Sequence, residues 1–250
     1  MAKRGIQLPA KLTRDAIVEA LLEIRFDMKT LPEVLFGRLA SYAPWQTFQQ
    51  KPMSAYNVPA PMREADVNLR YQPIFELVSD DRTRAVRIGS HVLSFHVMAP
   101  YIGWTLFKTE LENAVHQLFS SAEDLTVRRI GLRYTNALTP NDHGIRSIND
   151  LDVAITIAEE RILGSVNLNF MTDLSDNTRC TVRVATKDFV GGAIPEDTTI
   201  IIDVDVFTKD SFKTKTIADV QSWIEFAHEK EKVEFFHLLP RKAIDALKEA

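Results

Sequence analysis

Two arginines lie in the stretch Arg128–Asn136, which holds the side chains of this chain best suited to bind an anion. Apolar residues alternate with polar ones here, which predicts a strand with Arg129 and Arg133 on one face and the apolar residues on the other. Guanidinium groups form paired hydrogen bonds with carboxylates and phosphates. Gly131 lies between the two arginines and leaves space for such a group. The stretch therefore predicts either an anion-binding face or a row of ion pairs with a neighbouring strand.

The first hypothesis for these arginines is a binding site. Together with Arg25, which lies on another predicted strand, Arg129 and Arg133 would form a basic concavity. Tyr134 and Asn136 would lie near the rim of that concavity. Such a site would bind a small anionic ligand, such as a carboxylate or a phosphate, or the backbone of a nucleic acid.

The second hypothesis is structural. Glu19 and Glu23 alternate with Arg25 along the same predicted strand, so their carboxylates can neutralise the arginines across the sheet. Exposed sheet faces commonly carry such rows of mixed charge. We therefore expect ion pairing on this face more than a free anion site.

An enzymatic alternative rests on Asp203 and Asp205, which follow the glycine turn Val190–Gly192 after ten residues. This spacing resembles the nucleotidyltransferase signature, in which a turn of small residues holds the triphosphate and two strand carboxylates bind magnesium. That mechanism needs a helix between turn and strand, whereas residues 193–199 are few, polar and interrupted by proline. The simpler interpretation is a strand face whose carboxylates pair with an arginine such as Arg183.

The remaining reactive side chains do not form a recognisable catalytic or metal-binding pattern. His91 and His96 are five residues apart on a predicted strand and so point to opposite faces. His228 and His237 lie on opposite sides of a predicted helix. The single cysteine, Cys180, alternates with valines, which predicts a buried thiol rather than a nucleophile. We predict no cofactor and no metal.

Composition limits the class of protein. The chain has 250 residues, 45% of them hydrophobic, with a net charge of −4 and a pI near 5.9. These values predict a folded globular protein and disfavour broad binding to nucleic acids or anionic membranes. Neither an apolar run of about 18 residues nor an apolar signal core after Met1–Gly5 is present. We therefore expect a cytoplasmic protein that does not bind membranes.

In the first part of the chain, predicted strands and one long amphipathic helix must position these side chains. The proline-rich stretch 49–73 is predicted to be irregular, with one edge strand around 54–58. Residues 84–97 are predicted to be a strand whose odd-numbered residues, Arg87 and Leu93 among them, share one face. The other elements predicted in this part are strands at 16–26, 74–78 and 128–136, a short helix at 31–42 and a long helix at 104–118.

The second part of the chain repeats this order. Strands are predicted at 166–170, 180–184 and 200–206, a long helix from Ile217, and a short helix after Pro240. The turn formers at 140–144 mark the best break between halves, residues 1–140 and 141–250, which form either two units or one compact unit. The predicted fold class is α+β, with antiparallel sheets each covered by a long helix, and the order of elements raises the hypothesis of two similar α+β halves.

Several stretches together resemble the signature of a sporadically distributed, uncharacterised prokaryotic family of similar length. They are residues 16–26, 100–104, 129–136 and 202–207, with Ala227-His228 and residues 234–236 in the C-terminal helix. The chain departs from the family's usual proline-led start at Arg14 and Asp15. The resemblance implies a prokaryotic cytoplasmic protein from mobile or defence-associated genes, and it supplies no catalytic residues.

These observations favour a non-enzymatic module that binds a protein partner, a second copy of itself, or a ligand. A place in a mobile defence or toxin–antitoxin locus follows from the resemblance. The alternative is the magnesium-dependent nucleotide enzyme built on Asp203 and Asp205.

Overall fold

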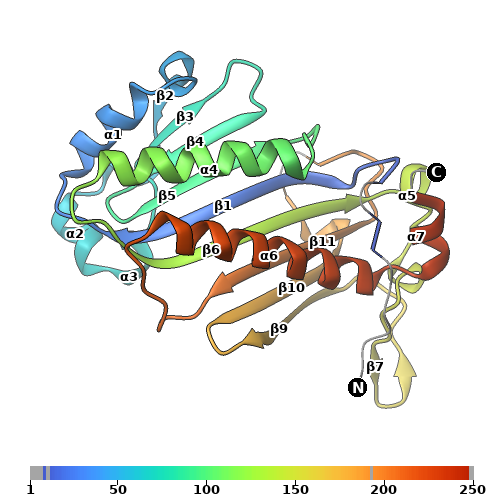
Figure 1. Ribbon diagram of the computed structural model, residues 1–250. Coiled ribbons are helices and arrows are strands. Elements are labelled where there is room, and N and C mark those ends of the chain that lie inside the picture. The colour runs from blue at the N-terminus through green and yellow to red at the C-terminus, as the bar shows by residue number, and fades with distance from the viewer. Residues whose placement is uncertain (1–7, 10–11, 192–193, 248–250) are drawn as a thin grey trace.

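The computed structural model describes residues 8–9, 12–191 and 194–247. Most of its strands are β1 (Ile17–Asp27), β2 (Gln49–Pro52), β3 (Phe75–Val78), β4 (Arg84–Ile88), β5 (Val92–Met98), β6 (Thr126–Leu138), β9 (Asn167–Ser175), β10 (Thr178–Thr186) and β11 (Ile200–Thr208). These nine strands form one antiparallel sheet in the order β2-β3-β4-β5-β1-β6-β11-β10-β9. The long strands β1 and β6 therefore form the centre of the sheet (Figure 1).

Two long helices, α4 (Trp104–Ser121) and α6 (Ile217–Leu238), lie side by side across one face of this sheet (Figure 1). They run antiparallel, because Trp104 stacks on His228 while Lys108, one turn further along α4, pairs with Glu225, one turn earlier on α6. The shorter elements are α1 (Pro32–Ala40), α2 (Ala60–Ala65), α3 (Val67–Arg70), α5 (Pro140–His143), α7 (Arg241–Leu247) and the hairpin of β7 (Thr156–Ile157) and β8 (Glu160–Arg161). Long helices thus cover only one face of the sheet in the described part of the chain.

The strand order has an internal symmetry. Each half starts with a central strand and ends with three antiparallel strands followed by a long helix: β1, β3, β4, β5, α4, and then β6, β9, β10, β11, α6. The first half also contains the edge strand β2, which has no counterpart in this series. In each half the last strand lies beside the first. The predicted α+β class is confirmed, and the two groups of strands join into a single sheet through β1 and β6. The division at residue 140 stays a prediction.

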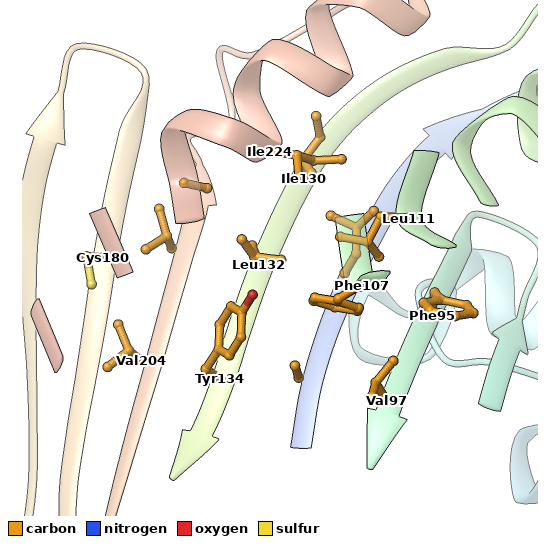
Figure 2. Packing of buried hydrophobic residues seen from close by; sticks show 14 of the residues in the cluster. Phe95, Val97, Phe107, Leu111, Ile130, Leu132, Tyr134, Cys180, Val204 and Ile224 are labelled. Atoms are coloured by element: carbon orange, nitrogen blue, oxygen red, sulfur yellow. The ribbon is translucent and has the colours of Figure 1, made fainter. Parts of the chain in front are cut away.

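The main core lies between the sheet and the two helices. Alternate residues of β6, including Leu132 and Tyr134, are buried against Phe107 and Leu111 of α4 and Ile224 of α6 (Figure 2). Removing such apolar surface from water is the main stabilising term in folding. The periodicities that predicted the central strand and both long helices are thereby confirmed.

One prediction about the sheet is wrong: residues 84–97 are a hairpin and not a single strand. The chain turns at Gly89, whose backbone N–H donates to the carbonyl of Val92. A Cβ at position 89 would lie 2.5 Å from the backbone oxygen of Gln72, so the turn requires glycine. The turn shifts the alternation, and Arg87 therefore lies on the open face while Leu93 enters the core.

The edge strand of the proline-rich stretch is also misplaced in the prediction. It is β2, which pairs with β3, whereas residues 54–57 form a 3₁₀ helix. Pro52 ends β2, in keeping with the lack of an N–H on proline. None of the described helices combines the length and the apolar character needed to cross a membrane.

Candidate functional site

Successive side chains of β6 point to opposite faces of the sheet and border two different cavities. On the open face lies the charged groove, of about 440 Å³, lined among others by Glu23, Arg25, Arg87, His96, Arg129, Arg133 and Asp205. Beneath the helices lies the aromatic pocket, of about 290 Å³, lined among others by Tyr101, Trp104, Tyr134, Asn136, His228 and Glu231. The structure thus brings Arg25, Arg129 and Arg133 together, and places Tyr134 and Asn136 on the other side of the sheet.

In the charged groove, Glu23 joins two of the predicted arginines. Arg25 and Arg129 are directly opposite each other on β1 and β6. Each donates to the same Oε1 of Glu23, at 2.8 Å. Arg25 also lies over the ring of Tyr71, and Arg129 over the ring of Phe207, both at 4.6 Å. These contacts hold both guanidiniums against the protein.

Arg133 finds its partner on β11. Its Nε donates to Oδ1 of Asp203 at 2.7 Å, and its second terminal nitrogen donates to Oδ2, so the pair is bidentate. Asp203 is buried, and its side chain is only 8% exposed. Asp205 lies next to this pair, where burial raises its pKa to about 6 despite the nearby guanidiniums of Arg129 and Arg133. The nearest of these nitrogens, on Arg129, is 3.7 Å from Asp205 Oδ2.

A third polar group on this face was not anticipated from the sequence. His96 of β5 shares hydrogen bonds with Glu19 of β1 and with Ser94, both at 2.8 Å. The hydrogen bond from His96 is the main cause that lowers the pKa of Glu19. This partner depends on the pairing of β1 with β5, which joins residues distant in the chain.

The ion-pairing hypothesis for the arginines is therefore the one that the contacts favour. Glu23 neutralises Arg25 and Arg129 as expected, whereas Glu19 pairs with His96 and leaves Arg133 to Asp203. On the same face, Arg87 pairs with Glu76 at 2.9 Å. Each of these guanidiniums already has a carboxylate, so an added anion would have to displace one.

The same contacts bear on the magnesium alternative. Both oxygens of Asp203 bind Arg133, and a second guanidinium lies beside Asp205. A divalent cation would need these two positive groups to move away. Among the described residues, no group of three or more His, Cys, Asp or Glu side chains could hold a metal ion. Gly192 of the glycine turn lies outside the described residues.

The aromatic pocket is built where α4 begins. Gly103 precedes the helix with φ of +84°, a conformation that glycine adopts at little cost, and it leads Tyr101 and Trp104 into the pocket. The ring of Trp104 stacks on His228 of α6, with centroids 3.7 Å apart and planes 9° apart. Burial is the main cause that lowers the pKa of His228 to about 3, so its imidazole is neutral at physiological pH.

The two tyrosines extend a chain of polar groups along the pocket. The hydroxyl groups of Tyr101 and Tyr134 lie 3.3 Å apart, and that of Tyr134 is 3.4 Å from Nδ1 of His228. Burial raises the pKa of both tyrosines, so both remain protonated. Asn136, two residues further along β6, donates from Nδ2 to the carbonyl of Ile202.

Glu231 is the unusual member of this pocket. It lies three residues after His228 on α6, so both side chains are on the same side of the helix. Its residue is 5% exposed. Its carboxyl forms no hydrogen bond or ion pair with the described residues, and its oxygens are not among the fully buried polar atoms that lack a partner, so they keep some access to the pocket. Burial is the main cause that raises its pKa to about 8, because the neighbouring Lys232 compensates only in part. Buried carboxyls without a partner are rare and concentrate at functional sites.

The sequence held signals for this pocket that the reasoning from patterns did not use. One such signal is the pair His228 and Glu231 at i, i+3 on a predicted helix, whereas His228 was compared only with His237. Tyr134 and Asn136 were expected beside the arginines, although strict alternation along β6 puts them on the opposite face. The stretches 100–104, 129–136, 227–228 and 234–236, which carry the family resemblance, all contribute to the pocket lining.

Comparisons with known proteins identify no family for this chain. No family model and no curated protein matches its sequence. Two structures of the duplicated taurocyamine kinase from Schistosoma mansoni are similar at 10% identity, with TM-scores of 0.38 for the substrate-free form and 0.42 for the form with bound transition state analog components. The alignments cover 76% and 87% of this chain but 29% and 32% of the kinase, so this chain spans less than a third of its length. Similarity at this level carries no functional argument.

Proposed function

We propose that this protein is a non-enzymatic ligand-binding module and that its ligand occupies the aromatic pocket. The observation that carries the proposal is Glu231, a buried carboxyl that lines the pocket and has no partner among the described residues. Burying such a group costs several kcal/mol unless something satisfies it. A ligand is the simplest source of that missing interaction.

The shape and lining of the pocket support the same proposal. Its volume of about 290 Å³ is near the lower end of the range for small-molecule sites. Aromatic side chains form much of its wall, and a few polar groups converge on it, as is typical of ligand sites. The charged groove is larger, but its arginines are already paired with carboxylates.

A screen of small molecules by thermal shift tests this proposal, because a ligand at about 100 times its dissociation constant stabilises the folded state by about 2.7 kcal/mol. Two variants assign each hit to a cavity. Trp104→Leu alters the aromatic pocket, and Asp205→Asn alters the charged groove on the opposite face of the sheet. Hits that Trp104→Leu abolishes and Asp205→Asn retains would support the pocket. Hits with the reverse pattern, or none from a broad panel, would contradict it.

The proposed module acts in the cytoplasm. In support, the sequence contains a single cysteine, Cys180, which is buried in the core. A fluorescent fusion expressed in a bacterial host, compared with a secreted control, tests this location.

A further inference from the structure

We infer that the aromatic pocket binds a small organic ammonium ion, with the ammonium group beside Glu231 and the apolar body of the ligand among the aromatic rings. The inference rests on the proposed function and adds the chemical class of the ligand. It follows from the hydrogen-bonding groups, the charges and the ring faces that the pocket presents.

Several polar groups of the pocket can accept hydrogen bonds. The carboxyl group of Glu231 can accept through two oxygens once it is ionised. Asn136 donates one N–H to the carbonyl of Ile202, and its amide oxygen can still accept a hydrogen bond. The hydroxyls of Tyr101 and Tyr134 can each accept as well as donate. A ligand with several N–H donors therefore complements these groups better than one with acceptors.

The charges around Glu231 also favour a cation. Asp15, which lines the same pocket just before β1, raises the pKa of Glu231, whereas Lys232 on α6 lowers it. His228 contributes no positive charge, since burial keeps it neutral. Tyr101, from the segment before α4, and Tyr134, from β6, stay neutral too. With both acids ionised, the lining carries two negative charges against one positive charge.

Aromatic side chains are the third feature of the pocket that favours an ammonium ion, besides its hydrogen-bond acceptors and its charges. Tyr101 and Tyr134 meet edge to face with centroids 5.9 Å apart, and Phe235 and Phe236 pack in the same way at 5.2 Å. All four residues line the pocket. Ring faces attract cations, and the attraction increases when water is excluded. An ammonium ion would thus pair with Glu231 and contact aromatic rings at once.

Three probes that share one skeleton separate the charge of the ligand from its shape: 2-phenylethylamine, 2-phenylethanol and phenylacetate. The chain with Glu231 intact is titrated with each of them by calorimetry. We expect the amine to bind roughly tenfold more tightly than the alcohol, and phenylacetate to bind most weakly. Because Glu231 is largely protonated at pH 7, binding of the amine should release about one proton, measured as a difference between buffers of different ionisation enthalpy.

Glu231→Gln should reduce binding of the amine to the level of the alcohol, and Glu229→Gln, an exposed neighbour on the same helix, should leave it unchanged. If Glu231→Gln does not fold, the three probes on the unmodified chain still test whether the pocket prefers an ammonium ion. Equal binding of amine and alcohol, preference for phenylacetate, or no binding of any probe would overturn the ammonium assignment. The separate screen of the pocket would still decide the proposed function, so the two failures are distinguishable.

Discussion

Arg133 and Tyr134 are neighbours on β6, yet they face very different surroundings. On the open face, Arg133 is held by both oxygens of Asp203, and the arginines beside it are paired with Glu23. On the helical face, Tyr134 borders a pocket in which the buried Glu231 has no partner among the described residues. The first face contains more charge, but its charges satisfy one another.

The difference shows why the number of charged residues is a poor guide to a site. Paired ions on a partly exposed sheet contribute modest stability and leave little binding capacity. An unpaired group in a buried pocket is costly to the fold and remains available for a ligand. We therefore expect substitutions on the open face to affect stability alone, and those in the pocket to affect stability and binding in opposite directions.

The largest effect should come from Glu231. Its raised pKa means that the folded state holds a proton that the unfolded state releases at lower pH, so the contribution of Glu231 to stability is greatest below about pH 4.5 and is lost between about pH 4.5 and pH 8. Each pKa unit corresponds to about 1.4 kcal/mol, so the loss should reach a few kcal/mol. Glu231→Gln should abolish the fall between about pH 6 and pH 8, above the raised pKa of about 6 of Asp205, as measured by urea unfolding. A fall that persists in the variant between pH 6 and pH 8 would show that Glu231 is not the cause.

The next largest effect should come from the buried partner of Arg133. Asp203→Ala should cost about 1–3 kcal/mol, because a charge-assisted pair is lost and a guanidinium is left behind. A double-mutant cycle with Arg133→Met should show coupling between the two sites. Asp173→Ala is the control, since its ion pairs with Arg179 and Lys209 lie on the exposed edge of the sheet and should contribute much less. Equal costs at the two positions would contradict the importance of burial.

A smaller effect is expected from Tyr134→Phe in the pocket. The substitution removes a hydroxyl that interacts with Tyr101 and His228, which should cost about 1 kcal/mol. Tyr42→Phe, at a partly exposed position, should be nearly neutral. Chemical denaturation of the three proteins provides the comparison. If Tyr134→Phe is as neutral as the control, the polar chain in the pocket does not stabilise the fold.

The smallest effect should come from Glu23→Gln in the charged groove. The carboxylate pairs with two arginines, but its side chain and theirs are 20–32% exposed. We expect a loss of about 0.5–1 kcal/mol that shrinks in 1 M salt, since ions screen partly exposed pairs. Unfolding measured at low and high salt checks this. A larger loss that salt does not reduce would mean that the groove is as dry as the pocket, and the contrast between the faces would fail.

Much of the fold was predictable because its signals are local. Strict alternation on β1 and β6 and the helical spacing on α4 identified the central elements. The hairpin of β4 and β5 was missed, because its turn depends on the close approach of Gln72 to Gly89. No local sequence pattern connects these two residues. The partner of Glu19 could not be predicted either, because the pairing of β1 with β5 brings together residues distant in the chain.

The sequence by itself determined the α+β class, the two long helices, and the separation of Arg129 and Arg133 from Tyr134 on β6, because these properties follow from the geometry of a helix or a strand. Only the tertiary structure decided that Asp203 lies beside Arg133, and that the start of α4 meets the middle of α6 around Glu231. Strand register and helix packing are set by contacts between residues distant in the chain. Those contacts determine which charges are paired and which remain available.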